Sequence, residues 1–409
     1  MSRGLAITTR KLALVFFLCV GTSSCQFDDT KFLPPTLFAR MRTPEIIRYW
    51  GYPAEEHKVT TEDGYILTIF RIPNPGKTPV LFLHGLFVTS DTWFSRNPSV
   101  DIVFLLWKRG YDIWLWNARG NVYSREHLNL TSEQNKFYRF SLSELALYDT
   151  TATIDYILNQ TGHNSLITLG HSLGTTNVLI AGSLRPEYQT KVRLSILWAQ
   201  SVFLGHMARK DLSETIFSNY VRLFDSKMEV GPVARILNEI ICNPNILVED
   251  LCTPFISLAS VLVGNVNNQT DLVAVEKIRK TFPSSTSLNV IRQVIQNIRS
   301  GEFRQLSYGR KGNLKRYGTI EPPLYPIEKF NTPTAIYFAC CNDFLSNSMD
   351  TRLLRKRLKH VVKFYEIPYK MFSHADYLFA VDSYRLLYRD VMATIDKYNP
   401  GHRSTKNQI

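Results

Sequence analysis

The segment Gly170-His171-Ser172-Leu173-Gly174 constrains the fold of this chain more than any other, because it places a serine at the apex of a sharp turn. An apolar, strand-like run at residues 166–169 precedes it, and a helix-like stretch at residues 175–184 follows it. Glycines two positions away on each side leave room for a backbone that turns so tightly. A strand, a turn and a helix in this order predict that Ser172 is a nucleophile. The alternative is a glycine-rich turn that only closes a βα unit.

A serine hydroxyl is a poor nucleophile near neutral pH, so it needs a histidine base, which in turn needs an acid to orient it. In enzymes with this turn, the acid and then the histidine follow the serine along the chain. Downstream of the turn and of residue 322, the histidines are His360, His374 and His402. His374 is predicted to be the base because it lies in a loop after the expected strand 362–367. His360 falls within a basic helical stretch, and His402 lies in the polar tail.

The acid is expected at the end of the strand that precedes the histidine. Asp343 follows the expected strand 334–339 by a short turn and is predicted to be this acid. Asp350 is the runner-up. It falls in the first turn of the next expected helix, where the helix dipole already favours a carboxylate.

Ester hydrolysis passes through a tetrahedral oxyanion, which two backbone N–H groups usually stabilise. One donor is expected from Leu173, the residue after the nucleophile. The other is expected from Leu86, in the loop that follows the apolar run at residues 80–83. His84 and His171 lie beside these positions and are predicted to shape the loops by hydrogen bonding, without transferring protons.

Apolar, strand-like runs alternate with helical stretches along the chain and occur at residues 80–83, 113–116, 166–169, 194–199, 334–339 and 362–367. This alternation predicts an α/β fold with a mostly parallel sheet and helices on both faces. The regularity lapses at residues 203–322, which are predicted to form an inserted, largely helical cap over the carboxyl ends of the strands. Residues 26–202 and 323–398 then form the two parts of the core domain, and residues 399–409 form a loose tail.

The N-terminal residues 1–25 resemble a secretory signal, with Arg10 and Lys11 before a short apolar stretch at residues 12–20. That stretch is too short to span a bilayer, and no run of 18 or more apolar residues occurs later in the chain. A secreted or lysosomal, soluble mature protein is therefore expected, and an uncleaved anchor is the alternative. Three glycosylation sequons agree with this route, at Asn129, Asn159 and Asn268.

Beyond the signal region, the cysteines fall into two pairs. Cys242 and Cys252 lie in a segment rich in turn residues, where an oxidising compartment favours a disulfide. Cys340 and Cys341 are adjacent, and because neighbouring cysteines seldom bridge each other they are predicted to be buried thiols. No spacing of cysteine and histidine resembles a zinc site, so no metal is expected.

The chain has a formal net charge of +13, and the basic residues are spread along it. A nucleic-acid protein would cluster them in a recognisable module, and none is present, so no nucleic-acid partner is expected. The local density is highest at residues 352–359. Leu353, Leu354 and Leu358 lie on one side of this stretch at helical spacing, which predicts a solvated amphipathic helix. Attraction to an anionic lipid surface is the alternative for this helix.

Several longer motifs accompany the serine turn, in the order Gly51-Tyr52-Pro53-Ala54-Glu55-Glu56, Thr61-Glu62-Asp63-Gly64-Tyr65-Ile66-Leu67, His84-Gly85-Leu86, Gly110-Tyr111-Asp112-Ile113-Trp114-Leu115-Trp116-Asn117-Ala118-Arg119-Gly120-Asn121, Ser300-Gly301-Glu302-Phe303 and His374-Ala375-Asp376-Tyr377. With them, residues 43–398 resemble the acid lipase family, which includes gastric lipase, lysosomal acid lipase and many insect gut lipases. The resemblance implies an α/β-hydrolase core with a lid-bearing cap, and hydrolysis of neutral lipid esters without a cofactor. It also implies the same three catalytic residues and a cap disulfide between Cys242 and Cys252.

The chain departs from the family pattern at several places. Leu173 stands where the family usually has glutamine, a change that a backbone donor survives. The cysteines at residues 340–341 replace the glycines that usually precede the acid. Asp343 and His374 lie 31 positions apart, slightly more than is usual, which suggests a longer histidine loop. In the cap, residues 283–287 read Pro-Ser-Ser-Thr-Ser instead of Pro-Ala-Gly-Thr-Ser.

These observations predict a serine ester hydrolase for triacylglycerols or sterol esters that works at a lipid–water interface, in transient contact with the lipid surface. Two alternatives stay open. One is a carboxylesterase for short, soluble esters, which the apolar cap disfavours. The other is a catalytically inactive lipid-binding protein with a hydrolase fold, which the filled catalytic positions disfavour.

Overall fold

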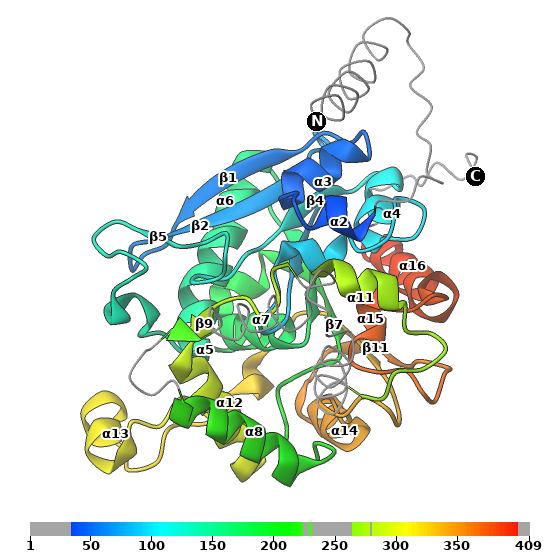
Figure 1. The fold of residues 1–409 in the computed structure, drawn as a ribbon. Helices are drawn as coiled ribbons and strands as arrows, with labels where there is room; N and C mark the ends of the chain where they lie inside the picture. The colour runs from blue at the N-terminus through cyan, green and yellow to red at the C-terminus, as the bar shows by residue number, and fades with distance from the viewer. Residues whose placement is uncertain (1–33, 224–228, 231–263, 279, 400–409) are drawn as a thin grey trace, which may run out of the picture.

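The computed structural model of the protein describes residues 34–223, 229–230, 264–278 and 280–399. Its centre is a nine-stranded sheet in the order β1-β2-β4-β3-β6-β7-β10-β11, with β5 beside β2 (Figure 1). The strands of this sheet are β1 Glu55–Thr60, β2 Tyr65–Ile72, β3 Pro79–Leu83, β4 Asp112–Leu115, β5 Glu126–His127, β6 Leu166–His171, β7 Val192–Trp198, β10 Thr334–Phe338 and β11 Val361–Glu366. The run from β4 through β3, β6, β7 and β10 to β11 is parallel, as predicted.

The six apolar runs predicted as strands are all strands, with ends that differ by one or two residues. They are β3, β4, β6, β7, β10 and β11. The central ones are covered on both faces, so their residues are apolar throughout and stand out in the sequence. The antiparallel strands β1 and β2 at the edge were not anticipated. In β1, exposed and partly buried side chains alternate, so the strand contains no apolar run.

Helices cover both faces of the sheet. Alternate side chains of a strand point to opposite sides, and in the central strands the apolar side chains on both sides pack against helices. Val80 and Phe82 of β3 pack in one core cluster with α3, α4 and α16, whereas Leu81 and Leu83 pack in another with α6, α7 and α14. The helices are α2 Pro35–Phe38, α3 Thr43–Tyr49, α4 Ile102–Lys108, α5 Leu142–Glu144, α6 Thr151–Thr161, α7 Leu173–Leu184, α8 Lys210–Leu223, α11 Leu272–Ile278, α12 Leu288–Ser300, α13 Gly309–Tyr317, α14 Ser348–Arg357, α15 Asp376–Phe379 and α16 Arg389–Lys397.

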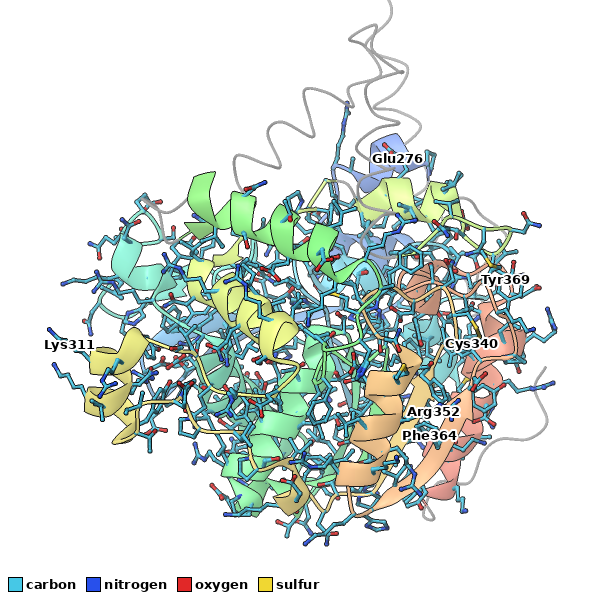
Figure 2. The ribbon with its side chains drawn as sticks, turned by 90° about the horizontal axis from the view of Figure 1, so that it is seen from below. Glu276, Lys311, Cys340, Arg352, Phe364 and Tyr369 are labelled. Carbon is cyan, nitrogen blue, oxygen red and sulfur yellow. A yellow bond between two sulfur atoms is a disulfide. The ribbon has the colours of Figure 1, made fainter. Side chains whose placement is uncertain are left out.

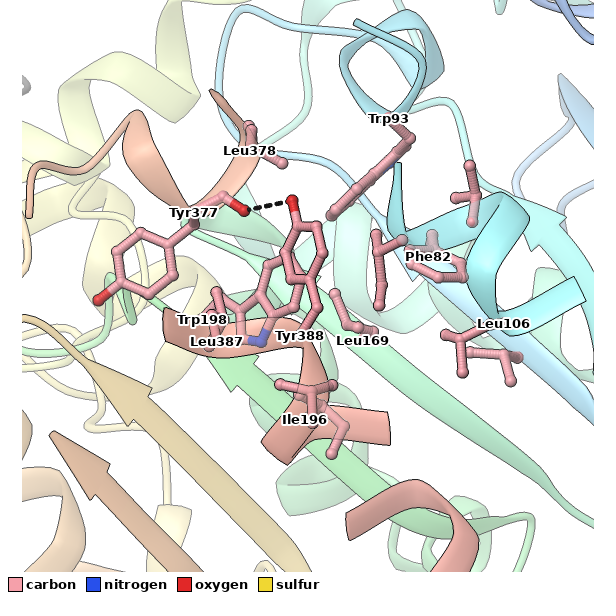
Figure 3. Close-up of a cluster of buried hydrophobic side chains, with 14 of the residues drawn as sticks. Phe82, Trp93, Leu106, Leu169, Ile196, Trp198, Tyr377, Leu378, Leu387 and Tyr388 are labelled. Carbon is pink, nitrogen blue, oxygen red and sulfur yellow. Dashed lines mark hydrogen bonds between the residues drawn. The ribbon is translucent and has the colours of Figure 1, made fainter. Parts of the chain in front are cut away.

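An aromatic cluster fastens the C-terminal part of the chain to the sheet (Figure 3). The ring of Tyr388 stacks on the indole of Trp198 at the end of β7, with centroids 5.5 Å apart and planes 4° apart. The Tyr388 hydroxyl donates to the carbonyl oxygen of Tyr377 at 2.9 Å. Tyr377 follows the predicted catalytic histidine by three positions. The cluster therefore anchors the chain just after the loop that carries His374.

The predicted cap, residues 203–322, contributes no strand to the central sheet within its described part. Its short strands β8 Glu229–Val230 and β9 Thr286–Ser287 pair with each other. Ser287 caps the N-terminus of helix α12, because its hydroxyl accepts from the Asn289 N–H at 3.0 Å. The division into core, cap and tail remains a prediction. Of the helices in the described residues, none is long and apolar enough to cross a membrane.

Candidate active site

Ser172 occupies a strained turn between β6 and α7, with φ 54° and ψ −120°. Non-glycine residues rarely adopt such a conformation, and it is typical of functional sites. A Cβ on Gly174 would lie 2.2 Å from the Leu83 carbonyl oxygen, and a Cβ on Gly170 would lie 2.7 Å from the backbone of Gly174. Both positions therefore require glycine, as the sequence pattern indicated.

Asp343 and His374, from the turn after β10 and the loop after β11, form a hydrogen-bonded pair. The Nδ1 atom of His374 lies 3.0 Å and 3.2 Å from the two carboxylate oxygens of Asp343. The Oδ1 atom of Asp343 also accepts from the backbone N–H groups of Leu345 and Ser346, at 3.2 Å and 2.8 Å. Because the carboxylate only accepts, Nδ1 of His374 carries the proton and Nε2 presents a basic lone pair.

The hydroxyl oxygen of Ser172 lies 3.1 Å from that of Ser201, in the loop after β7. In the described structure no hydrogen bond joins Ser172 to His374. The Ser201 N–H donates to Thr175 Oγ1 at 3.3 Å, and its carbonyl accepts from Thr176 Oγ1 at 3.1 Å. No sequence signal pointed to Ser201, since no motif includes it and it lies 29 positions from Ser172.

The loop after β3 packs directly against the serine turn. A Cβ on Gly85 would lie 3.1 Å from the Cβ of Ser172. The next residue, Leu86, lines the same cavity as Ser172 and Leu173. The structure thus brings together both residues that were expected to donate N–H groups to an oxyanion.

His84 shapes this loop as expected. Its Nε2 atom accepts from the Ala118 N–H at 3.2 Å and lies 3.3 Å from the side-chain nitrogen of Asn121. Nδ1 therefore carries the proton and donates to the Gly85 carbonyl at 2.8 Å. Burial lowers the pKa of His84 to about 4, so the ring is neutral over most of the physiological range.

His171 supports the histidine loop from the strand side. Its Nε2–H donates to the backbone carbonyl of His374 at 3.0 Å, and the two ring centroids are 4.9 Å apart. Burial, and then the charge of His374, hold the pKa of His171 well below its usual value of 6.5. His171 is therefore a neutral structural group, as expected.

The buried side-chain amide of Asn342 joins the turn that carries Asp343 to the loop that carries His374. The turn between β10 and α14, residues 339–347, is here called the acid turn, and the loop between β11 and α15, residues 367–375, the histidine loop. Its Nδ2 atom donates to the carbonyl oxygens of Met371 at 2.7 Å and Asn265 at 2.8 Å, and its Oδ1 accepts from the Asn265 N–H at 3.0 Å. Asn342 also forms a parallel bridge with Ser373. Sequence reasoning missed this residue, although it directly precedes the predicted acid.

The expectation that Cys340 and Cys341 are buried thiols is wrong, because a disulfide joins them. They lie in the turn between the end of β10 and Asn342, outside the apolar core, and Cys341 is exposed. Partial exposure to solvent at this turn disfavours two buried thiols, and adjacent positions hold the two Cα atoms 3.7 Å apart. The other expected pair, Cys242 and Cys252, lies outside the described residues.

The structure places the runner-up residues elsewhere. Asp350, in the first turn of α14, accepts from the backbone N–H of His206 at 2.8 Å, and the Nδ1 atom of His206 lies 2.7 Å from its other oxygen. His360 is exposed, with Nδ1 3.3 Å from the carbonyl oxygen of Asn331. His402 lies outside the described residues.

Ser172 opens onto a cavity of about 60 Å³ with mostly apolar walls, formed by Leu86, Leu142, Ser172, Leu173, Ser201, Leu204, Met207, Val294, Asn297, Ile298 and Leu345. Asn297 is its other buried polar group, and Asn297 Oδ1 has no hydrogen-bond partner. The cavity is smaller than the roughly 300–1,000 Å³ that is typical of ligand pockets. A larger hollow of about 690 Å³ between α8 and α12 contains none of the predicted site residues.

The remaining predicted sites are peripheral. The three sequon asparagines are exposed, and they are Asn129, Asn159 and Asn268. The expected signal, residues 1–25, lies outside the described part of the chain. Within the described ranges, no group of three or more His, Cys, Asp or Glu side chains is arranged to hold a metal ion.

Solved structures with a similar fold share little sequence with this chain. A candidate lipase from Sulfolobus solfataricus has a TM-score of 0.56 at 14% identity, over 84% of this chain and 94% of that one. A membrane phospholipase A described as a bacterial virulence factor has a TM-score of 0.50 at 14% identity, over 96% of this chain and 99% of that one. These likenesses concern the fold alone.

Sequence comparison is more specific. Residues 43–97 match the partial alpha/beta-hydrolase lipase region, and residues 78–197 match the alpha/beta hydrolase fold. Lipase member K of Homo sapiens is 33% identical over 88% of this chain and 92% of its own length. Lipase 1 of Drosophila melanogaster is 32% identical over 89% of this chain and 82% of its own length. Gastric triacylglycerol lipase of Bos taurus is 32% identical over 87% of this chain and 91% of its own length. With this sheet, this serine turn and relatives matched over most of their length, the chain belongs to the acid lipase family of α/β-hydrolases.

Proposed function

We propose that this acid lipase cleaves neutral lipid esters, triacylglycerols or sterol esters, through an acyl-enzyme on Ser172. The observation that carries the proposal is the Asp343–His374 pair, which follows the parallel strands β10 and β11. In the same sheet β6, separated from β10 by β7, leads into the strained turn at Ser172. Relatives named as lipases, one of them a triacylglycerol lipase, support this substrate class. The apolar wall of the cavity beside Ser172 is suited to a hydrocarbon chain.

In the proposed reaction, Nε2 of His374 accepts the proton of the Ser172 hydroxyl while the oxygen attacks the ester carbonyl carbon. Asp343 holds the imidazole through Nδ1–H and stabilises the positive charge that forms on the ring. The imidazolium then protonates the leaving alcohol, and the acyl group stays on Ser172. Water attacks the acyl-enzyme by the same route and releases the fatty acid.

The oxyanion of each tetrahedral intermediate is assigned to the N–H groups of Leu86 and Leu173. Two features support this assignment. Leu173 is the first residue of α7, whose N-terminal N–H groups lack partners within the helix. The loop that carries Leu86 packs on the Cβ of Ser172 and is held by neutral His84. No cofactor enters this scheme.

The place of action is proposed from the sequence. A signal at residues 1–25 would direct the chain to secretion or to the lysosome, and the exposure of Asn129, Asn159 and Asn268 is compatible with glycans there. A disulfide between Cys340 and Cys341 also fits an oxidising compartment.

A carboxylesterase for short, soluble esters is the second candidate, and the cavity favours it. A space of about 60 Å³ holds only a few water molecules, so a long acyl chain can bind only if the lining side chains move. Chain-length preference separates the two candidates. A catalytically inactive lipid-binding protein would instead retain lipid and fail to react with a serine-directed phosphonate.

The test is hydrolysis of a long-chain triglyceride emulsion and of a soluble short-chain ester by the wild type, Ser172→Ala and Ser183→Ala between pH 4 and 8. Ser183 is a matched control, because its buried hydroxyl lies on the same helix α7 and has no hydrogen-bond partner. Ser172→Ala should lower turnover of both substrates by about 10⁴-fold or more, with unchanged unfolding. Retained esterase activity in Ser172→Ala would sink the assignment, and activity on the soluble ester alone would establish the carboxylesterase.

A further inference from the structure

Residues 305–323, here called the α13 excursion, leave the body of the protein and return to it at one place. Gln305 N–H donates to the Pro323 carbonyl at 2.9 Å, and Arg304 and Leu324 form an isolated bridge next to it. A side-chain nitrogen of Arg304 donates to the Pro322 carbonyl at 2.9 Å. The excursion carries α13 away from the sheet, at the edge of the molecule (Figure 1).

The α13 excursion is internally ordered. The buried side chain of Asn313 accepts from the Tyr308 N–H at 2.8 Å and donates to the Ile320 carbonyl at 2.7 Å. The Tyr317 hydroxyl donates to the Leu306 carbonyl at 2.8 Å. These hydrogen bonds, all between residues of the excursion, fix its conformation from within.

Apolar side chains on and beside the excursion face solvent. Their exposed fractions are 40% for Tyr308, 46% for Leu314, 45% for Ile320 and 44% for Leu324. Asn313 is the one residue of α13 that is buried, so the helix adds almost nothing to the core. A group of exposed apolar side chains on an ordered projection is typical of an interaction surface.

Cations accompany these apolar side chains. Arg310, Lys311 and Lys315 are exposed, and no carboxylate of the described residues lies within ion-pair distance of them. Figure 2 shows Lys311 at the outer side of α13. Arg316 differs, because it pairs with Glu144 of the body at 2.9 Å. Glu321 is the one acid of the excursion.

Helix α14, the basic helix that the sequence singled out, has the opposite character. Leu354 and Leu358 are buried, so its apolar side packs on the core as predicted for an ordinary solvated helix. Arg352 pairs with Glu366 at 3.0 Å. Helix α14 is therefore basic and has one large exposed apolar side chain, Met349, which is 59% exposed, whereas the α13 excursion presents several beside its cations.

The excursion is attached to the helix that walls the candidate active site. Gln296 of α12 donates to the Gln305 carbonyl at 2.8 Å and accepts from the Ser307 N–H at 2.7 Å. The next two residues of α12, Asn297 and Ile298, line the cavity beside Ser172. The excursion is thus joined to a helix that forms part of the wall of this cavity.

We propose that the α13 excursion docks the enzyme on anionic phospholipid surfaces, with Arg310, Lys311 and Lys315 near the headgroups and Leu314 and Ile320 at the acyl boundary. Basic residues beside exposed apolar ones are the combination that binds such surfaces. The inference rests on the proposed function only in that a lipase needs access to lipid. It assigns the contact to a place on the fold that lies outside the catalytic groups.

The test is sedimentation of the full-length protein with vesicles of phosphatidylcholine alone or mixed with phosphatidylserine, in the Ser172→Ala background so that the lipids stay intact. One variant combines Arg310→Glu, Lys311→Glu and Lys315→Glu. The matched control combines Arg355→Glu, Lys356→Glu and Lys359→Glu, which are exposed cations at α14 with the same residue types and the same change of net charge. A third variant, Leu314→Ser with Ile320→Ser, removes the apolar part.

The parent should bind phosphatidylserine vesicles more tightly as their anionic fraction rises and less tightly as salt increases. The α13 charge reversal removes three cations and adds three anions, so it should weaken binding by at least roughly 100-fold, and the α14 control should change it far less. The variant that combines Leu314→Ser and Ile320→Ser should lose the part of the vesicle binding that persists at high salt.

Two results would overturn the inference. One is an equal loss of vesicle affinity in the α13 and α14 charge-reversal variants, and the other is no preference of the parent for phosphatidylserine. The surface would then fit an acidic protein instead. Hydrolysis of a soluble ester by both charge reversals with Ser172 intact checks their folding. Failure of the wild type to hydrolyse any ester would count against the proposed function and leave the vesicle result standing.

Discussion

The hydroxyl of Ser172 can donate one hydrogen bond and accept two, and Ser201 occupies one of these positions. If Ser201 donates to the Ser172 oxygen, the Ser172 proton is left for His374. The loop that carries Ser201 is fixed at both its backbone N–H and its carbonyl. The Ser201 hydroxyl can therefore hold the side chain of Ser172, the proposed nucleophile, in one orientation.

Ser201→Ala should lower kcat for a soluble ester by about threefold to tenfold, the range expected for one hydrogen bond of about 0.5–1.5 kcal/mol. The rate of reaction with a serine-directed phosphonate should fall in parallel, while KM and the unfolding midpoint stay near those of the wild type. Ser183→Ala is the control again and should leave both rates unchanged. An unchanged phosphonate rate in Ser201→Ala would show that this contact does not position the nucleophile.

At the residue scale, the order of serine, acid and histidine along the chain predicted three side chains, two of which form a hydrogen-bonded pair. Ser201 and Asn342 could not be predicted in this way, because their contacts join loops that only the folded sheet brings together. The adjacent cysteines were predicted wrongly, since the general rarity of such disulfides says nothing about the solvent exposure of one particular turn.

At the scale of elements, the acid turn and the histidine loop depend on each other through Asn342. Asn342→Ala would remove three hydrogen bonds between these segments, although the carbonyls of Met371 and Asn265 keep Asn267 Nδ2 as a second donor. We expect a loss of about 1–3 kcal/mol in unfolding free energy. We also expect kcat for a soluble ester to fall about tenfold with little change in KM, because His374 loses its fixed relation to Asp343.

The matched control for this variant is Asn347→Ala, at the start of α14. The Asn347 side chain accepts from the Met349 N–H at 2.8 Å and caps the helix without touching the histidine loop. Its loss should cost about 1 kcal/mol of stability and leave kcat unchanged. If both variants lower kcat in proportion to stability, Asn342 has no specific positioning role.

The parallel strands could be predicted from sequence because burial on both faces makes them continuously apolar. The edge strand β1 could not, since solvent exposure mixes charged residues into it. Strand β2 was missed although it is largely apolar and six of its eight residues are buried. The apolar side of α14 was predicted from its spacing and is buried. The projection of α13 has no such signature, because its exposure depends on where the chain leaves and rejoins the body.

At the scale of the whole molecule, buried histidines make stability depend on pH. The folded-state pKa of His84 is about 4, lowered by burial from 6.5. Between these values the unfolded chain binds a proton that the folded chain does not. This contribution to stability is therefore present above pH 6.5 and is lost as the pH falls toward 4. Asp101 acts in the opposite sense, because burial raises its pKa to about 6.

Comparison with His84→Gln isolates the histidine, since Asp101 contributes equally to both proteins. Between pH 7 and pH 4.5, urea unfolding should show that the wild type loses about 2 kcal/mol more than the variant. Parallel stability curves for the two proteins across this range would contradict the assignment of a neutral, buried His84.

The way in which the α13 excursion leaves and rejoins the body has a consequence for how this enzyme can diverge. The backbone pairing at residues 304–305 and 323–324 closes the excursion, so changes within it need not move the walls of the cavity. Mutation can thus alter the charge of the proposed lipid-binding surface while the proposed chemistry at Ser172 stays constant. Related enzymes of one catalytic type can then be sorted among lipid environments by a few surface positions, and a graft of residues 305–323 would transfer that preference between them.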